Sequence, residues 1–381
     1  MMIFSVIPLL ALYVFLRVVW PNCGVRGRAF FAVLLILAAA FPSYVDYFGG
    51  GIVSPTLGFV PMIIGEVLLI TLLQTAVFFL IRDVFIVAGW ILLRRKTILS
   101  TAKVAAGVFG FSVIVTLYAF VHALADPVIH RFTVEIENLP EELSGITIAQ
   151  LSDLHQANIF GPERLERIVQ KTNALGSDLI VITGDFADAT VEKRGHELDA
   201  LKKLKAPLGV YGCEGNHEYY ADYEGWKRVI PTLGVRMLKN EHDVLYRNGR
   251  PFVIFGLTDR AAFRFSGREL PNTEKALKGA PTGLFTLALI HQPLLAKMAL
   301  DAGADLMLSG HTHGGQTYLW SIVVALFNKG YVRGLYDLER EDSQKMQMYV
   351  HSGTGFWTGF IERIGTDNEI ALITLKRAEK H

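Results

Sequence analysis

The stretch Asp178-Leu179-Ile180-Val181-Ile182-Thr183-Gly184-Asp185 is an unbroken apolar and β-branched run that leads into a glycine and a carboxylate. A short run of this kind, bounded by a turn residue, predicts a buried β-strand. In open α/β sheets, ligands bind in the crevice outside the carboxyl ends of the strands. The stretch therefore predicts an α/β domain in which Asp185 lies at a ligand-binding edge.

Four more strand-like stretches end at polar residues of the same chemical kind. They are residues 145–152 before Asp153 and His155, residues 208–211 before Gly215-Asn216-His217-Glu218, residues 284–290 before His291, and residues 304–309 before His311 and His313. Two divalent ions about 3.5–4 Å apart need imidazole, carboxylate and amide ligands and one bridging carboxylate. Asp185 is the natural bridge. Because thiolates are missing from this set, it favours manganese, with iron, zinc or cobalt as alternatives, over magnesium alone.

The order and spelling of these motifs resemble the calcineurin-like metallophosphoesterase superfamily. The extended motif Gly310-His311-Thr312-His313-Gly314-Gly315-Gln316 is similar to that of its bacterial membrane-associated branch. The resemblance covers His130 to Lys376. One such motif occurs by chance in many chains, whereas five in this order, each after a strand, are specific. The resemblance implies an α/β/β/α sandwich with two mixed sheets.

The resemblance also implies a role for each polar residue. One metal would be held by Asp153, His155, Asp185 and His313, and the other by Asp185, Asn216, His291 and His311. A metal-bridging hydroxide would attack phosphorus, and His217 would be the catalytic residue that protonates the leaving oxygen. Glu218 either orients His217 or lies outside the chemistry. Asp188 is interpreted as a turn residue or as a support for the ligands.

The first third of the chain is predicted to lie in a membrane. Hydrophobic residues make up 51% of the chain, and their excess lies before Asp126. A span needs about 20 apolar residues. Four candidates are Met2–Trp20, Phe30–Phe48, Phe59–Ile81 and Val104–Ala125, and Asp83–Leu93 either extends the third or lies at the interface. We therefore expect a transmembrane domain of about four helices in residues 1–126 and a metallophosphoesterase domain in residues 127–381.

Loop charges predict the orientation of these spans. Basic residues gather in two loops, with Arg26 and Arg28 in the first and Arg94, Arg95, Lys96 and Lys103 in the last, whereas the loop between them carries only Asp46. The positive-inside rule makes both basic loops cytoplasmic. We expect an integral protein of the plasma (inner) membrane with its catalytic domain on the extracytoplasmic face.

Net charge restricts the possible binding partners, and cysteine content restricts the possible disulfides. The net charge is only +1 and the sequence has no basic stripe, which argues against a nucleic-acid partner. Cys23 and Cys213 form no disulfide framework. The expected partners are a phosphoester substrate, with a lipid as one option, and the bilayer, and the oligomeric state stays undefined. The apolar run Tyr318–Phe327 either dips into the lipid interface or packs in the domain core.

Three functions follow. The first is a membrane-bound hydrolase of a phosphodiester or pyrophosphate in a lipid-linked or amphiphilic substrate, with a diester favoured over a monoester. The second is a phosphohydrolase of soluble phosphoesters that is merely anchored to the membrane. The third is a catalytically silent metal-binding module, which the complete ligand set and His217 argue against.

Overall fold

The computed structural model describes residues 2–51, 55, 57–94, 101–157, 159–339 and 345–378. These residues form two compact units. The first is Met1–Leu124 with Gly359–Glu362, and the second is Ala125–Thr358 with Arg363–His381. Arg95 and Lys96, expected in the last basic loop, lie outside the described residues.

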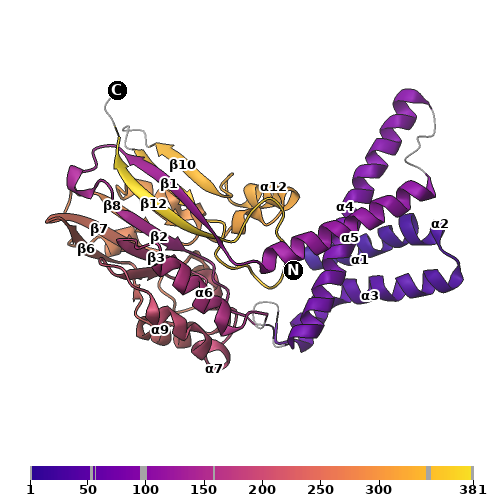
Figure 1. The fold of residues 1–381 in the computed structure, drawn as a ribbon, viewed down its shortest axis with the longest axis horizontal. Coiled ribbons are helices and arrows are strands. Elements are labelled where there is room, and N and C mark those ends of the chain that lie inside the picture. Colours follow the sequence, from indigo (N-terminus) through magenta and orange to yellow (C-terminus); the bar gives the residue numbers. More distant parts are fainter. Residues whose placement is uncertain are drawn as a thin grey trace. The chain divides into compact units, whose positions relative to one another are not determined.

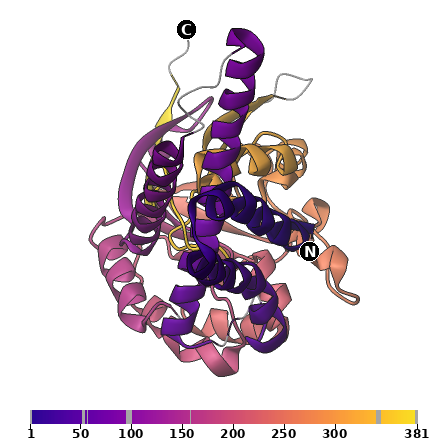
Figure 2. The same ribbon diagram turned by 90° about the vertical axis from the view of Figure 1, so that its right-hand side faces the viewer.

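The first unit is helical. Its elements are α1 (Met2–Val14), the π-helical turn η1 (Phe15–Val19), α2 (Trp20–Asn22), α3 (Val25–Phe48), α4 (Phe59–Leu93) and α5 (Ala102–Leu124). Helix α4 is central, because it contacts α1, α3 and α5 (Figures 1 and 2). By length and composition, three helices of the described residues are able to cross a membrane, namely Val25–Phe48, Phe59–Leu92 and Ala102–Leu124.

The first expected span differs from the observed helices, whereas residues 83–93 extend the third span, which is one of the two expected alternatives. The region of Met2–Trp20 is helical, but its apolar part, Val6–Asn22, is shorter than the other three and contains the π turn. Residues 83–93 continue α4 without a break. This continuation places Asp83 inside an apolar helix, where it pairs with Arg17 at 2.7 Å and accepts a hydrogen bond from Tyr13 at 2.9 Å. Such pairing is what a carboxylate in an apolar helix requires.

The second unit contains two six-stranded mixed sheets, as the family resemblance implies. The first sheet has the order β1 (Val128–Ile136), β12 (Glu369–Arg377), β2 (Thr147–Leu151), β3 (Leu179–Thr183), β4 (Val210–Cys213) and β5 (Arg236–Met237). The second has the order β10 (Gly334–Glu339), β11 (Lys345–Val350), β9 (Leu306–Ser309), β8 (Thr286–Leu289), β7 (Arg250–Gly256) and β6 (Glu241–Arg247). Strands β2 to β5 run parallel, and so do β7, β8, β9 and β11.

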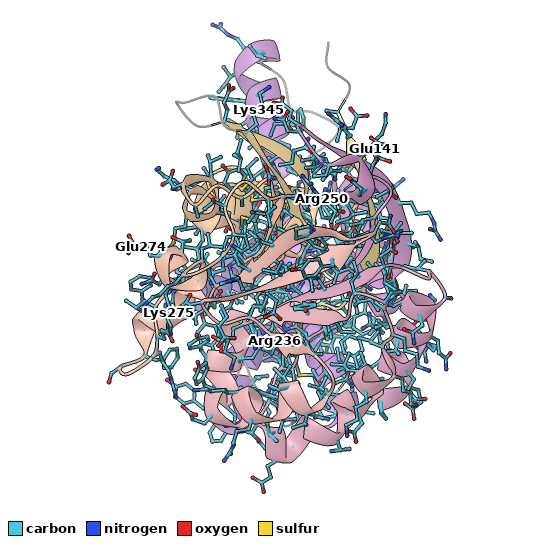
Figure 3. The ribbon with its side chains drawn as sticks, turned by 90° about the vertical axis from the view of Figure 1, so that its left-hand side faces the viewer. Glu141, Arg236, Arg250, Glu274, Lys275 and Lys345 are labelled. Atoms are coloured by element: carbon cyan, nitrogen blue, oxygen red, sulfur yellow. The ribbon has the colours of Figure 1, made fainter. Side chains whose placement is uncertain are left out.

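The layers follow from alternation along the strands. Val181 of β3 points into the core between the sheets with Leu287 of β8, whereas Ile180 and Ile182 face the outer helices. Helices α6 (Pro162–Asn173) and α9 (Tyr223–Thr232) cover the first sheet, and α10 (Thr273–Ala276) and α11 (Ala296–Asp301) lie against the second (Figure 1). The outer surface carries charges of both signs, among them Glu141, Arg236, Arg250, Glu274, Lys275 and Lys345 (Figure 3).

Residues 191–203 form two short helices of different type. A short α7 (Val191–Arg194) is followed by a 3-10 helix, η4 (Gly195–Lys203). Gly195 is a weak helix former, and the buried Leu198 and Leu201 are spaced at the three residues per turn of a 3-10 helix. Tyr318–Phe327 forms a helix, α12, that leaves part of its apolar surface exposed.

Candidate metal centre

The predicted ligands all lie in loops that follow the carboxyl ends of strands. Asp153 and His155 follow β2, Asp185 follows β3, and Asn216 opens the short helix α8 (Asn216–Ala221) after β4. His291 follows β8, and the loop with His311 and His313 follows β9. The parallel strand directions therefore bring five loops from two sheets to one place.

One group of donors contains Asp153, His155 and His313, whose ligand atoms lie within 4.8 Å of one another. The Nε2 atoms of His155 and His313 are 3.0 Å apart, and Nε2 of His313 is 3.4 Å from Oδ1 of Asp153. The Nδ1 atom of His155 lies 2.6 Å from Oδ1 of Asp188, which assigns the ring proton to Nδ1. Its Nε2 lone pair is thus directed at the same point as the other donors, which suits a cation.

A second group contains Asp185, His291 and His311. Nε2 of His291 is 3.2 Å from Oδ2 of Asp185 and 3.1 Å from Oδ1 of Asn216. Nδ1 of His291 donates to the carbonyl oxygen of Thr183 at 2.7 Å, which directs its Nε2 lone pair into the group. Oδ2 of Asp185 is also 3.6 Å from Nε2 of His155, so this carboxylate lies between the two groups.

The backbone at these donors is strained. Positive φ values occur at five of them, Asp153 (52°), His155 (44°), Asp185 (56°), His311 (72°) and His313 (50°). Such angles are uncommon for residues other than glycine, and they persist where surrounding structure enforces them. The surrounding structure therefore fixes the directions of these side chains, which an unstrained backbone after a strand would not adopt.

Two motif glycines permit the close approach of the loops. A Cβ atom at Gly184 would lie 2.7 Å from Nδ1 of His291, and one at Gly310 would collide with the side chains of Ser152 and Asp153. The glycine that precedes Asp185 and the glycine that precedes His311 are thus required by packing, because only glycine lacks this atom.

Asp188 has a larger part in the site than its sequence position indicated. Its Oδ1 atom lies 2.6 Å from Nδ1 of His155 and 2.7 Å from Nδ1 of His217, and all three side chains are buried. Although burial favours the neutral acid, these two imidazoles lower the pKa of Asp188 to about 2. The sequence signal for Asp188 is its position three residues after Asp185. In the structure, its loop pairs with the loop of His155 through a bridge between Gln156 and Ala187.

Glu218 faces the backbone of the ligand loops. Its carboxylate accepts hydrogen bonds from the N–H groups of Asp185 at 3.2 Å, Phe186 at 2.7 Å and Gly215 at 2.7 Å. Asp185 and Phe186 belong to the loop that carries the donor Asp185, and Gly215 belongs to the loop that leads to the donor Asn216. These contacts do not support the orientation of His217 by Glu218, and they show instead that its carboxylate holds two ligand loops together.

Arg363 is a residue that sequence reasoning missed. Its buried guanidinium donates to the carbonyl oxygens of His313 at 3.2 Å, Ser352 at 2.8 Å and Gly355 at 2.8 Å. Gly355 in turn donates its N–H to the carbonyl oxygen of Asp153 at 2.9 Å. Arg363 thus links the loop of His313 to the loop of Asp153, and no local sequence signal marks it.

Protonation of the imidazoles fits a metal site. Burial lowers the pKa of His311 to about 4 and that of His313 to about 3, so both rings are neutral at pH 7 and available as ligands. At His291, burial acts in the same direction, but the carboxylate of Asp185 outweighs it and raises the pKa to about 10. In the metal-free protein the proton on His291 therefore supplies the positive charge beside Asp185 that a bound metal ion would otherwise supply.

Comparison with known proteins agrees with this geometry. Residues 146–315 match the family model of the calcineurin-like phosphoesterases. A protein of Danio rerio named "Transmembrane protein with metallophosphoesterase domain" is 36% identical over 273 residues, which are 70% of this chain and 61% of that protein. The protein of the same name from Bos taurus is 31% identical over 276 residues, again 70% of this chain and 61% of that protein.

A bacterial relative is covered more fully. A metallophosphoesterase of Helicobacter pylori is 32% identical over 286 residues, which are 74% of this chain and 72% of that protein. With two mixed sheets and clusters of histidine and aspartate at the carboxyl ends of their strands, the chain belongs to the calcineurin-like metallophosphoesterase family.

Proposed function

We propose that this chain is a membrane-bound phosphoesterase that uses two divalent metal ions. The observation that carries the proposal is the pair of donor groups with Asp185 beside both, since its Oδ2 atom lies 3.6 Å from Nε2 of His155 and 3.2 Å from Nε2 of His291. The proposed ligands are Asp153, His155, Asp185 and His313 for one ion, and Asp185, Asn216, His291 and His311 for the other. When bound, such a pair polarises the phosphoryl oxygens and lowers the pKa of water, and manganese, iron, zinc or cobalt suits these donors.

His217 is the proposed general acid. Its Nδ1 atom is 2.7 Å from Asp188, whose lowered pKa keeps the carboxylate anionic at neutral pH. In this proposal Asp188 holds the ring at its Nδ1 side, and the opposite nitrogen, Nε2, delivers the proton to a leaving oxygen. Asp188 acts through His217 and is a positioning residue. Leaving oxygens of high pKa gain most from this proton.

The proposed substrate is a phosphodiester or pyrophosphate in an amphiphilic or lipid-linked molecule. Its support is the first unit, with three helices long and apolar enough to cross a membrane, because a soluble substrate gives no chemical reason for such an anchor. We place the protein in the plasma membrane with the second unit on the extracytoplasmic face. Arg26 and Arg28, in the first turns of α3, support this orientation through the positive-inside rule.

The experiment compares wild type with Asp185→Asn as detergent-solubilised, manganese-loaded protein. Phosphorus NMR follows a total membrane lipid extract, and a chromogenic diester is assayed in parallel. Exposed His196, replaced by Gln, is the matched control. New phosphomonoester signals in wild type and in His196→Gln alone are expected. Full turnover by Asp185→Asn would overturn the assigned site, and cleavage of the chromogenic diester without any lipid product would favour the soluble substrate.

A further inference from the structure

Helix α12 (Tyr318–Phe327) exposes an apolar face on the second unit. Ile322 is 59% exposed, Leu326 78% and Phe327 75%. Ile322 and Leu326 are four residues apart and share one side of the helix, and Phe327 adjoins them. Single exposed apolar side chains are ordinary, whereas three within six residues of one helix form a patch. We call Ile322, Leu326 and Phe327 the α12 patch.

This helix is attached directly to the loop that carries His313. Thr317, four residues after His313, is the N-cap of the helix. Its Oγ1 atom accepts a hydrogen bond from the N–H of Trp320 at 3.3 Å. The backbone N–H of Ser321 donates to the carbonyl oxygen of Thr317 at 2.8 Å, and Ser321 lies so close to Gly315 that a Cβ at that glycine would collide with it. A surface that binds α12 therefore lies close to the proposed metal ligands.

The charged residues that directly follow α12 in the chain are cations. From His311 to Tyr336 the chain contains no Asp or Glu, and its two cations are the exposed Lys329 and Arg333, just beyond the helix. Elsewhere on this unit the surface mixes both signs, as the labelled residues of Figure 3 show. An apolar helix face followed by basic residues is the composition of elements that lie at the surface of anionic lipid.

The size of the patch and the covalent chain favour lipid over a second copy. A helix of ten residues is roughly 15 Å long and offers on the order of 150 Å², whereas a stable protein interface buries about 800 Å² on each partner. Only Ala125, Asp126 and Pro127 join α5 to β1. If α5 lies in a bilayer, this short connection supplies lipid at high effective concentration, so even a weak contact is occupied.

We propose that the α12 patch inserts into the boundary between head groups and acyl chains of an anionic bilayer. Lys329 would face the lipid phosphates. The inference deepens the proposed function and rests on it, because docking of α12 brings the phosphoester of an amphiphile to the loop of His311 and His313. The occupant is the bilayer, and self-association of the chain is the alternative outcome of the test.

The test uses the full chain in nanodiscs made with or without anionic phosphatidylglycerol. Cys23 is replaced by Ser, and the buried Cys213 is left in place. An environment-sensitive fluorophore is attached to Leu326→Cys or, as a matched exposed control on β6, to Tyr246→Cys. Nitroxide groups on the lipid acyl chains are expected to quench the label at position 326 several-fold more than at 246, with a larger difference in anionic discs. Equal quenching at the two positions would overturn the proposal. Self-quenching of the label at position 326 that does not depend on lipid composition would also overturn it, because it would indicate self-association.

A kinetic experiment separates this inference from the proposed function. The variant Leu326→Gln/Phe327→Gln is compared with Tyr246→Gln on a chromogenic diester in solution and on an amphiphilic diester in nanodiscs. The α12 variant should raise KM at least about tenfold for the nanodisc substrate only, because apolar burial is lost. Unchanged KM on both substrates would contradict docking. If wild type hydrolyses neither diester, the proposed function fails, and the quenching result still decides whether α12 meets lipid.

Discussion

Asp188 lies 2.7 Å from His217, measured from its Oδ1 atom to Nδ1 of the imidazole. The same oxygen is 2.6 Å from Nδ1 of His155. One buried carboxylate therefore supports both a proposed metal ligand and the proposed general acid. Such partners fix the tautomer and the direction of an imidazole, and their loss affects both binding and proton transfer.

Asp188→Asn is expected to lower kcat in a way that depends on the leaving group. For a diester that releases an alkoxide, kcat should fall on the order of 10²-fold, because His217 loses the carboxylate that lies beside its Nδ1 atom. For a nitrophenolate leaving group, which needs little protonation, the loss should be much smaller. A series of leaving groups of increasing pKa measures this slope. A uniform loss across the series would show a purely structural role.

Glu218→Gln should weaken the metal site through the backbone. A Gln amide nitrogen cannot accept a hydrogen bond, so at least one of the N–H groups of Asp185, Phe186 and Gly215 is left buried without its acceptor. The expected cost is about 1–3 kcal/mol. Calorimetric titration with Mn²⁺ and thermal unfolding measure it, with the exposed Glu274→Gln as control (Figure 3). Identical affinities and Tm values for the two variants would contradict this role.

Metal affinity should increase as pH rises from 6 to 8. In the metal-free protein, nearby carboxylates outweigh burial and hold the pKa of His291 at about 10 and that of His155 well above its usual value. These protons compete with the cation, so binding releases them and is favoured when protons are scarce. Titration calorimetry in buffers of different ionisation enthalpy counts the protons. Affinity that falls with pH would have the wrong sign.

Arg363→Lys should destabilise the second unit and loosen metal binding together. Lysine cannot reach the carbonyl oxygens of His313, Ser352 and Gly355 at once, as the guanidinium does. A loss of about 2–3 kcal/mol, or roughly 5–10 °C in Tm, is expected. Retention of Tm after the exposed Arg250→Lys change is the control. A stable variant with unchanged Mn²⁺ affinity would remove Arg363 from the site.

Chelation of metal should lower the Tm of the second unit. The donors converge at strained backbone positions such as His155 and Asp185. A ligand that binds only the folded state stabilises it, so its removal has the opposite effect. Intrinsic fluorescence with and without EDTA measures the shift, and re-addition of Mn²⁺ should restore it. An unchanged Tm would argue against a resident metal.

The sequence by itself determined the strands and the order of the ligands. The apolar run before Gly184 and Asp185 is a local signal, and so are the runs before His291 and His311, because a buried strand needs consecutive apolar residues. Parallel strands then bring their carboxyl ends to one edge, which made a shared site predictable without coordinates. Helical spans were predictable for the same reason, since length and apolarity are local properties.

Only the tertiary structure decided what supports those ligands. The N–H of His311 reaches the carboxylate of Asp153 across 158 residues, and Arg363 reaches His313 across 50. Contacts of Asp188 with His217 and of Glu218 with the backbone of Asp185 likewise join different loops. The exposure of Leu326 also depended on what packs nearby. Hydrophobic pattern encodes which face of an element is buried, but loop-to-loop hydrogen bonds depend on where distant segments meet, and no local pattern records that.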